Sequence, residues 1–175
     1  DGSQWDRLFA DGEQFRIGSL AAHVMLSPAH ALASITYVVG DAAFVHDTLM
    51  VPDSGTSRAD FPGGNARALW RSIRAILELP PSTATYVGHD YGKDGREVFG
   101  RSTVADQRRD NIHVHNGIGE AEFVATREKR DATLPLPDLM LAALQVNIRG
   151  GRLPEPEACG TAFLKVPLNH FGAGK

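Results

Sequence analysis

Short runs of apolar and β-branched residues alternate with turn-forming residues along the first half of the chain. Runs of this kind predict strands over residues 15–17, 21–26, 34–39, 42–45 and 85–88. The clearest is Ser34-Ile-Thr-Tyr-Val-Val39, which is rich in β-branched and aromatic side chains. Gly40-Asp41 follows it directly, and this pair predicts a two-residue hairpin turn into the next strand.

Helical periodicity appears between and after these strands. Residues 66–79 place apolar side chains on one face and arginines on the other, and Asn65 can cap the start of this helix. Pro80-Pro81 ends it. Thr103 and Asp106 resemble a capping box, which predicts that a helix begins there. Further helices are expected over residues 119–131 and 137–147, and a last strand over 163–168. Strands followed by strand–helix alternation indicate an α/β or α+β fold.

One long segment, from Asp47 to Gly64, matches neither pattern and contains several glycines and prolines. Loops of this length inside a compact domain usually serve a function. The glycine-rich and proline-rich loops are therefore where a site is expected.

Composition narrows the class of function. The chain has 175 residues, which predicts one domain over 1–175, and a net charge of −3, which argues against nucleic acid or an anionic membrane as a partner. No apolar run approaches the roughly 20 residues of a membrane span, and no signal peptide is visible. Cys159 is the single cysteine, so an internal disulfide is excluded and a reducing, cytoplasmic location is expected.

Three polar residues follow the ends of predicted strands: His30, Asp47 and His89. If strand 21–26 and strand 42–45 both pair antiparallel with strand 34–39, then the two point the same way. A right-handed crossover through helix 66–79 would give strand 85–88 that direction too. The three side chains would then meet at one edge of the sheet.

Two imidazoles and one carboxylate form a ligand set that suits zinc or non-haem iron. The alternative for each residue alone is ordinary: a loop histidine is usually solvated, and Asp47 can be a turn residue. His113 and His115 form an H-x-H pair, but we expect a polar connection between two helices there rather than a metal site.

The sequence around these residues resembles the metallo-β-lactamase superfamily. Ser27-Pro-Ala-His30 resembles its T-P-G-H turn, the stretch ending in His46-Asp-Thr-Leu49 resembles its G-D-T-L strand end, and Gly88-His-Asp-Tyr91 resembles its late ligand histidine. Three further segments are similar to the persulfide dioxygenase branch, near the glyoxalase II thioesterases: 55–64, 102–108 with 111–114, and 144–149.

This resemblance implies a four-layer αββα sandwich, of which the chain would hold mostly the C-terminal half. It also implies Fe(II), or alternatively zinc, and the oxidation of glutathione persulfide by O₂ to sulfite and glutathione. The alternatives are thioester hydrolysis of the glyoxalase II type and a non-catalytic remnant of the fold that self-associates.

The resemblance also implies residue roles. His30 and Asp47 match metal ligands, and His89 matches the histidine that binds a second metal in two-zinc hydrolases and stays beside the iron in dioxygenases. Four residues match positions that line the glutathione pocket: Arg58, Tyr91, Ile148 and Arg149. Arginine suits such a role because its guanidinium pairs with carboxylates.

Departures from the family pattern set further expectations. The family's H-x-H-x-D-H motif does not occur in this chain and is expected upstream of residue 1, so one iron ligand is missing. Ala29 and His46 stand where the family usually has glycine, and Ala29 disfavours a positive φ. Half a sandwich would expose an apolar sheet face, which predicts a homodimer or a higher homo-oligomer.

Overall fold

The computed structural model describes residues 2–166, and these form two compact units. One unit is Phe9–Leu134, and the other combines residues 2–8 with residues 135–166. None of the helices within residues 2–166 has both the length and the apolar character needed to cross a bilayer.

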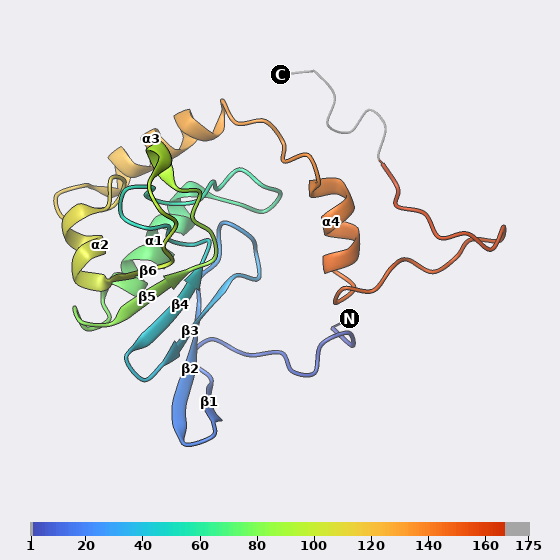
Figure 1. Ribbon diagram of the computed structural model, residues 1–175, viewed down its shortest axis with the longest axis horizontal. Coiled ribbons are helices and arrows are strands. Elements are labelled where there is room, and N and C mark those ends of the chain that lie inside the picture. The colour runs from blue at the N-terminus through green and yellow to red at the C-terminus, as the bar shows by residue number, and fades with distance from the viewer. Residues whose placement is uncertain (1, 167–175) are drawn as a thin grey trace. The chain divides into compact units, whose positions relative to one another are not determined.

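The larger unit is built on a six-stranded sheet in the order β1-β2-β3-β4-β5-β6 (Figure 1). The strands are β1 (Gln14–Ile17), β2 (Leu20–Leu26), β3 (Ile35–Val39), β4 (Ala42–His46), β5 (Ala84–Val87) and β6 (Arg101–Thr103). All neighbours pair antiparallel except β4 and β5, which are parallel. The five strands expected from the sequence are confirmed, and so is the common direction of β2, β4 and β5. The three-residue β6 was not predicted.

Helix α1 (Ala66–Leu77) provides the crossover between β4 and β5 and packs on one face of the sheet. Its apolar side chains join Val38, Ala43 and Val45 of the strands in the core. The predicted N-cap is confirmed, because Asn65 Oδ1 accepts a hydrogen bond from Ala68 N–H at 2.9 Å. The helix ends two residues before the predicted boundary.

Two more helices belong to this unit, α2 (Val104–Asp110) and α3 (Glu120–Asp131). The capping box of Thr103 and Asp106 is confirmed at the start of α2. Helix α3 packs on α1, where Phe123 and Trp70 bring their ring centroids to 5.4 Å. A short 3-10 turn, η1 (Lys93–Gly95), lies in the loop after β5.

The sheet face opposite α1 carries aromatic side chains from neighbouring strands. The Phe44 and Tyr86 rings stack with centroids 5.2 Å apart, and Tyr37 meets Phe15 edge-on at 5.8 Å. Phe44 keeps 45% of its surface exposed and Tyr86 keeps 37%. The exposed apolar sheet face expected from the sequence is therefore present at these two residues.

The smaller unit contains α4 (Met140–Asn147), which begins three residues after the expected start. The Gln145 side chain pairs with the backbone of Lys165 in both directions, at 2.7 and 2.8 Å. The strand expected over residues 163–168 is wrong for 163–166, which form no strand, and residues 167–168 lie outside the described part. The segment bonds instead to a side-chain amide, a partner that hydrophobic alternation does not reveal.

Candidate metal centre

The loops after β2, β4 and β5 bring His30, Asp47 and His89 together, as their positions in the sequence predict. His30 Nε2 lies 3.7 Å from Asp47 Oδ2, and His89 Nδ1 lies 2.7 Å from Asp47 Oδ1. The side chains of His30 and Asp47 are mostly buried, while that of His89 is 57% exposed. The carboxylate thus stands between two imidazoles at the predicted edge of the sheet.

Hydrogen bonding determines which nitrogen of His30 faces the carboxylate. His30 Nδ1 lies 2.9 Å from the carbonyl oxygen of Arg58. Because a carbonyl only accepts, Nδ1 carries the proton, and neutral His30 has its lone pair on Nε2. This lone pair and a carboxylate oxygen therefore face each other, an arrangement that favours a shared cation.

The separation fits two ligands of one ion. Ligand atoms each about 2.1 Å from a zinc or similar ion lie roughly 3–3.5 Å apart, slightly less than the observed 3.7 Å. Within residues 2–166, however, no group of three or more histidine, cysteine, aspartate or glutamate side chains is arranged to hold a metal. The site described here thus supplies two facing donors, with His89 hydrogen-bonded to one of them.

His46 lies beside this centre and has a backbone φ of 34°. Its ring centroid is 6.4 Å from that of His30. Burial lowers the pKa of His46, and the imidazoles of His30 and His89 act in the same direction against the opposing effect of Asp47. Ala29, the other departure from the family pattern, has a φ of 129°. Both residues thus hold backbone conformations that favour glycine.

Gly88 provides the space that the Asp47 carboxylate occupies. A Cβ atom at position 88 would lie 2.8 Å from Asp47 Oδ1, whereas one at Gly100 would meet nothing within 4 Å. Neither glycine has a positive φ, so backbone strain does not distinguish them.

We therefore expect Gly88→Ala to displace Asp47 and weaken metal binding by about 10- to 100-fold. Gly100→Ala is the matched control and should bind metal as the wild type does. Titration with Co²⁺, followed by its visible absorption, measures both. Equal affinities for the two variants would contradict this role of Gly88.

Arg96 joins the loops that carry Asp47 and His89. Its guanidinium binds Asp53 at 2.5 and 2.8 Å and Asp90 at 2.5 and 2.8 Å, and it lies 4.2 Å from the centroid of the Phe99 ring. These hydrogen bonds lower the pKa of Asp53 and hold that of Asp90 well below the usual range. The cluster was not predicted, because its members are separated by up to 43 residues.

The long loop between Asp47 and Gly64 is anchored by two fully buried amides. Gln107 Nε2 donates to the Met50 carbonyl at 2.8 Å, and Asn111 Nδ2 donates to the Gly55 carbonyl at 3.0 Å. Gln107 and Asn111 also bond to each other at 2.6 Å. Both belong to segments that carry the family resemblance, and here they hold the loop in place.

His113 adds a third anchor of this loop. Its Nδ1 accepts a hydrogen bond from Thr56 N–H at 3.0 Å. Burial, reinforced by Arg127, Arg130 and Lys93, lowers the pKa of His113 to about 4. His113 is thus a half-buried histidine that bonds to the loop backbone and resists protonation.

His113 predicts a pH dependence of stability. Its pKa is lower in the folded chain than the usual 6.5, so the folded state resists protonation. The stability it contributes is complete above pH 6.5 and is lost as the pH falls toward 4. We expect the free energy of unfolding to fall by about 1–2 kcal/mol over this range because of His113. Urea unfolding of the wild type and of His113→Gln, each at pH 6.5 and at pH 4, measures this contribution. The variant should lose this part of the pH dependence, and an equal pH dependence in both proteins would contradict the prediction.

Two of the predicted substrate residues lie near the centre in the larger unit. Arg58 binds Asp60 through two hydrogen bonds of 2.6 and 2.7 Å and lies 4.7 Å from the Phe61 ring centroid. This contact lowers the pKa of Asp60. Tyr91 is 80% exposed, and its ring lies parallel to that of His89 with centroids 6.0 Å apart.

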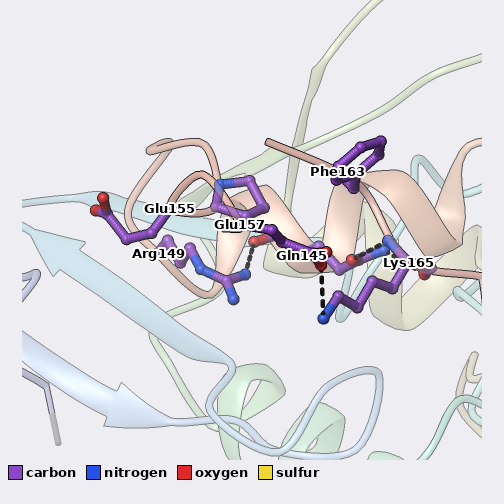
Figure 2. A pocket seen from close by; sticks show the side chains of 7 residues that line it. Gln145, Arg149, Glu155, Glu157, Phe163 and Lys165 are labelled. Atoms are coloured by element: carbon purple, nitrogen blue, oxygen red, sulfur yellow. Dashed lines mark hydrogen bonds and ion pairs between the residues drawn. The ribbon is translucent and has the colours of Figure 1, made fainter. Parts of the chain in front are cut away.

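The other two predicted substrate residues, Ile148 and Arg149, belong to the smaller unit. Arg149 lines a pocket of about 310 Å³ and donates a hydrogen bond to the Gln145 carbonyl (Figure 2). Glu155, Glu157 and Lys165 also line this pocket, and Lys165 pairs with Glu157 at 3.1 Å. The Ile148 side chain is largely exposed, and its carbonyl accepts from Gln4 Nε2.

Known proteins resemble this chain over most of its length. The "Beta-lactamase hydrolase-like protein" of Xylella fastidiosa is 61% identical over 169 residues, which are 97% of this chain and 39% of that protein. "Glyoxylase B2" of Dictyostelium discoideum is 46% identical over 98% of this chain and 59% of its own length. Human "Persulfide dioxygenase ETHE1, mitochondrial" is 32% identical over 86% of this chain and 56% of its own length.

Among solved structures, ETHE1 from Myxococcus xanthus superposes with a TM-score of 0.72 at 36% identity, over 82% of this chain and 60% of that one. No family model matches the chain. The chain spans about two fifths of the length of the Xylella protein and about three fifths of the Dictyostelium protein.

Proposed function

Because this chain belongs to the metallo-β-lactamase superfamily, we propose that His30 and Asp47 bind one divalent metal, Fe(II), for the oxidation of glutathione persulfide by O₂. The facing lone pair and carboxylate support a metal at this position. Zinc is the alternative metal, since imidazole and carboxylate suit both ions. The H-x-H-x-D-H motif expected from the resemblance would complete the ligand set.

The hydrogen bond of His89 leaves one of its nitrogens available to a metal. His89 Nδ1 lies 2.7 Å from Asp47 Oδ1, and because an ionised carboxylate only accepts, Nδ1 is the donor. Neutral His89 then keeps its lone pair on Nε2, so this contact is compatible with one metal and with two. The single-metal reaction is therefore proposed on the similarity to the persulfide dioxygenases in sequence and structure.

In this proposal the metal supplies binding and activation of O₂, and the chain supplies orientation. The Arg58 carbonyl fixes the His30 ring, and His89 fixes the Asp47 carboxylate, in the way that hydrogen bonds behind metal ligands usually act. Water and O₂ add three oxygen atoms to the outer sulfur of the persulfide, which leaves as sulfite together with glutathione and protons.

The thiol-bearing substrate would lie against Tyr91, whose exposed ring is parallel to His89. A tyrosine ring in this place can cover the sulfur arm and donate a hydrogen bond. We propose that Arg58 contacts the peptide part. Ile148 and Arg149 belong to the smaller unit, and their contact with glutathione stays a prediction from the resemblance. The Arg58 guanidinium already binds Asp60, so substrate would share or exchange that contact.

The deciding experiment loads the protein with Fe(II) under anaerobic conditions and measures O₂ uptake with glutathione persulfide. Uptake with stoichiometric sulfite, and one iron per chain, is the expected result. Metal content as zinc alone, with no O₂ uptake after iron loading, would overturn the proposed reaction.

The second candidate is a metal-dependent thioester hydrolase of the glyoxalase II type. The higher identity to the Dictyostelium glyoxylase, 46% against 32% for the human dioxygenase, favours it. Hydrolysis of S-lactoylglutathione by the same preparation, with two metals per chain, would support this candidate over the first.

A further inference from the structure

We propose that Arg127 and Asp131 of α3 are positioning residues for the metal centre. They form a clamp, by which we mean the ion pair of these two side chains together with its bonds to Thr56 and Ala59. The clamp fixes the peptide of Arg58 and, through it, the orientation and tautomer of His30. The consequence for metal affinity rests on the proposed function, whereas the effect on the tautomer does not.

The clamp bonds to the backbone of the loop on both sides of Arg58. Arg127 Nη1 donates to the Thr56 carbonyl at 3.0 Å, and Asp131 Oδ2 accepts from Ala59 N–H at 2.8 Å. The two side chains are held together by bonds of 2.6 and 2.9 Å between the guanidinium and Asp131 Oδ1. Two loop residues, Ser57 and Arg58, thus lie between two fixed points.

Burial makes this clamp a rigid feature of the fold. The Arg127 and Asp131 side chains are 2% and 5% exposed, so both partners are buried, whereas Arg96 in its pair with Asp90 is 24% exposed. The helix that carries them packs on α1 in the core. A buried pair of this kind contributes little net stability on average, because desolvation offsets the attraction. Its placement on the loop backbone therefore points to positioning.

The hydrogen bond between the Arg58 carbonyl and His30 connects the clamp to the metal centre. The Arg58 carbonyl is 2.9 Å from His30 Nδ1, which must carry the proton. If the peptide rotates, His30 loses that acceptor, and its proton can move to Nε2. A proton on Nε2 would remove the lone pair that faces Asp47 Oδ2.

The test replaces both charged residues at once, as Arg127→Met with Asp131→Leu. Similar apolar volumes in place of a buried ion pair usually preserve the fold. In the metal-free protein at alkaline pH, long-range ¹H–¹⁵N spectra should show wild-type His30 as the Nδ1–H tautomer and the double variant as a mixture. Co²⁺ titration should show the dissociation constant raised about 10- to 100-fold.

The matched control removes an exposed ion pair between α1 and α3 that does not touch the loop, Arg67→Gln with Glu120→Gln. It should leave the tautomer and the Co²⁺ affinity unchanged. If the first double variant does not fold, Arg127→Lys keeps the positive charge and loses the forked guanidinium that reaches both Asp131 and Thr56, and the same readouts apply.

A folded clamp variant in which His30 keeps the single Nδ1–H tautomer would overturn the proposal. The His30 tautomer is measured in the metal-free protein, so this measurement tests the role of the clamp even if the wild type binds no Co²⁺. Failure of the wild type to bind metal would count against the proposed function alone.

Discussion

Replacement of Asp47 by Asn is expected to lower the metal affinity of the centre by about 100-fold or more and, under the proposed function, to lower O₂ uptake with glutathione persulfide with it. Asp47 contacts both histidines of the centre, and its Oδ2 atom is the charged donor that faces His30 Nε2. An amide has the same shape but neither the charge nor the second acceptor, so it can no longer bind an ion and accept from His89 together. Isothermal titration with Zn²⁺ and Co²⁺ measures the loss.

Asp41→Asn is the matched control, because Asp41 lies exposed in the hairpin turn between β3 and β4. It should bind metal with wild-type affinity. Unaltered affinity in Asp47→Asn, with the fold preserved by circular dichroism, would remove Asp47 from the ligand set and with it the proposed centre.

Gly55→Ala is expected to destabilise the fold by about 3–4 kcal/mol, the largest effect on stability that we predict for a single added methyl group. Two causes act together at this position. Gly55 has a φ of +81°, and its added Cβ atom would lie 2.2 Å from His113 Nδ1. The collision would force apart the bonds from Thr56 to His113 and from Asn111 to the Gly55 carbonyl, and urea unfolding measures the cost.

Gly12→Ala separates the two causes. Gly12 has a φ of +72°, and nothing lies within 4 Å of an added Cβ atom. This variant should lose only about 1 kcal/mol, the cost of a side chain in the left-handed region. If both variants lost the same amount, the contact with His113 would have no part in stability.

The sequence predicts much of how the centre is assembled. A two-residue turn sets the opposite directions of β3 and β4, and an antiparallel pairing of β2 with β3, assumed at that point, gives β2 the direction of β4. A right-handed crossover through the helix then allows β5 the same direction, which brings His30, Asp47 and His89 to one edge of the sheet.

The residues that support the centre could not be predicted in the same way. Arg127 lies 71 residues from Thr56, and Asn111 lies 56 residues from Gly55. Their partners are backbone groups, which leave no sign in the sequence because every residue has them. The contact between Arg58 and Asp60 is local, but an arginine two residues from an aspartate has too many alternative partners for this spacing to predict the contact.

The parallel pairing of β4 with β5 has a consequence for the order in which Asp47 and His89 meet. The two residues follow strands that are joined through helix α1, so a hairpin alone cannot bring them together. Their contact requires the crossover to be complete, and it is therefore a marker of the native topology rather than of local structure.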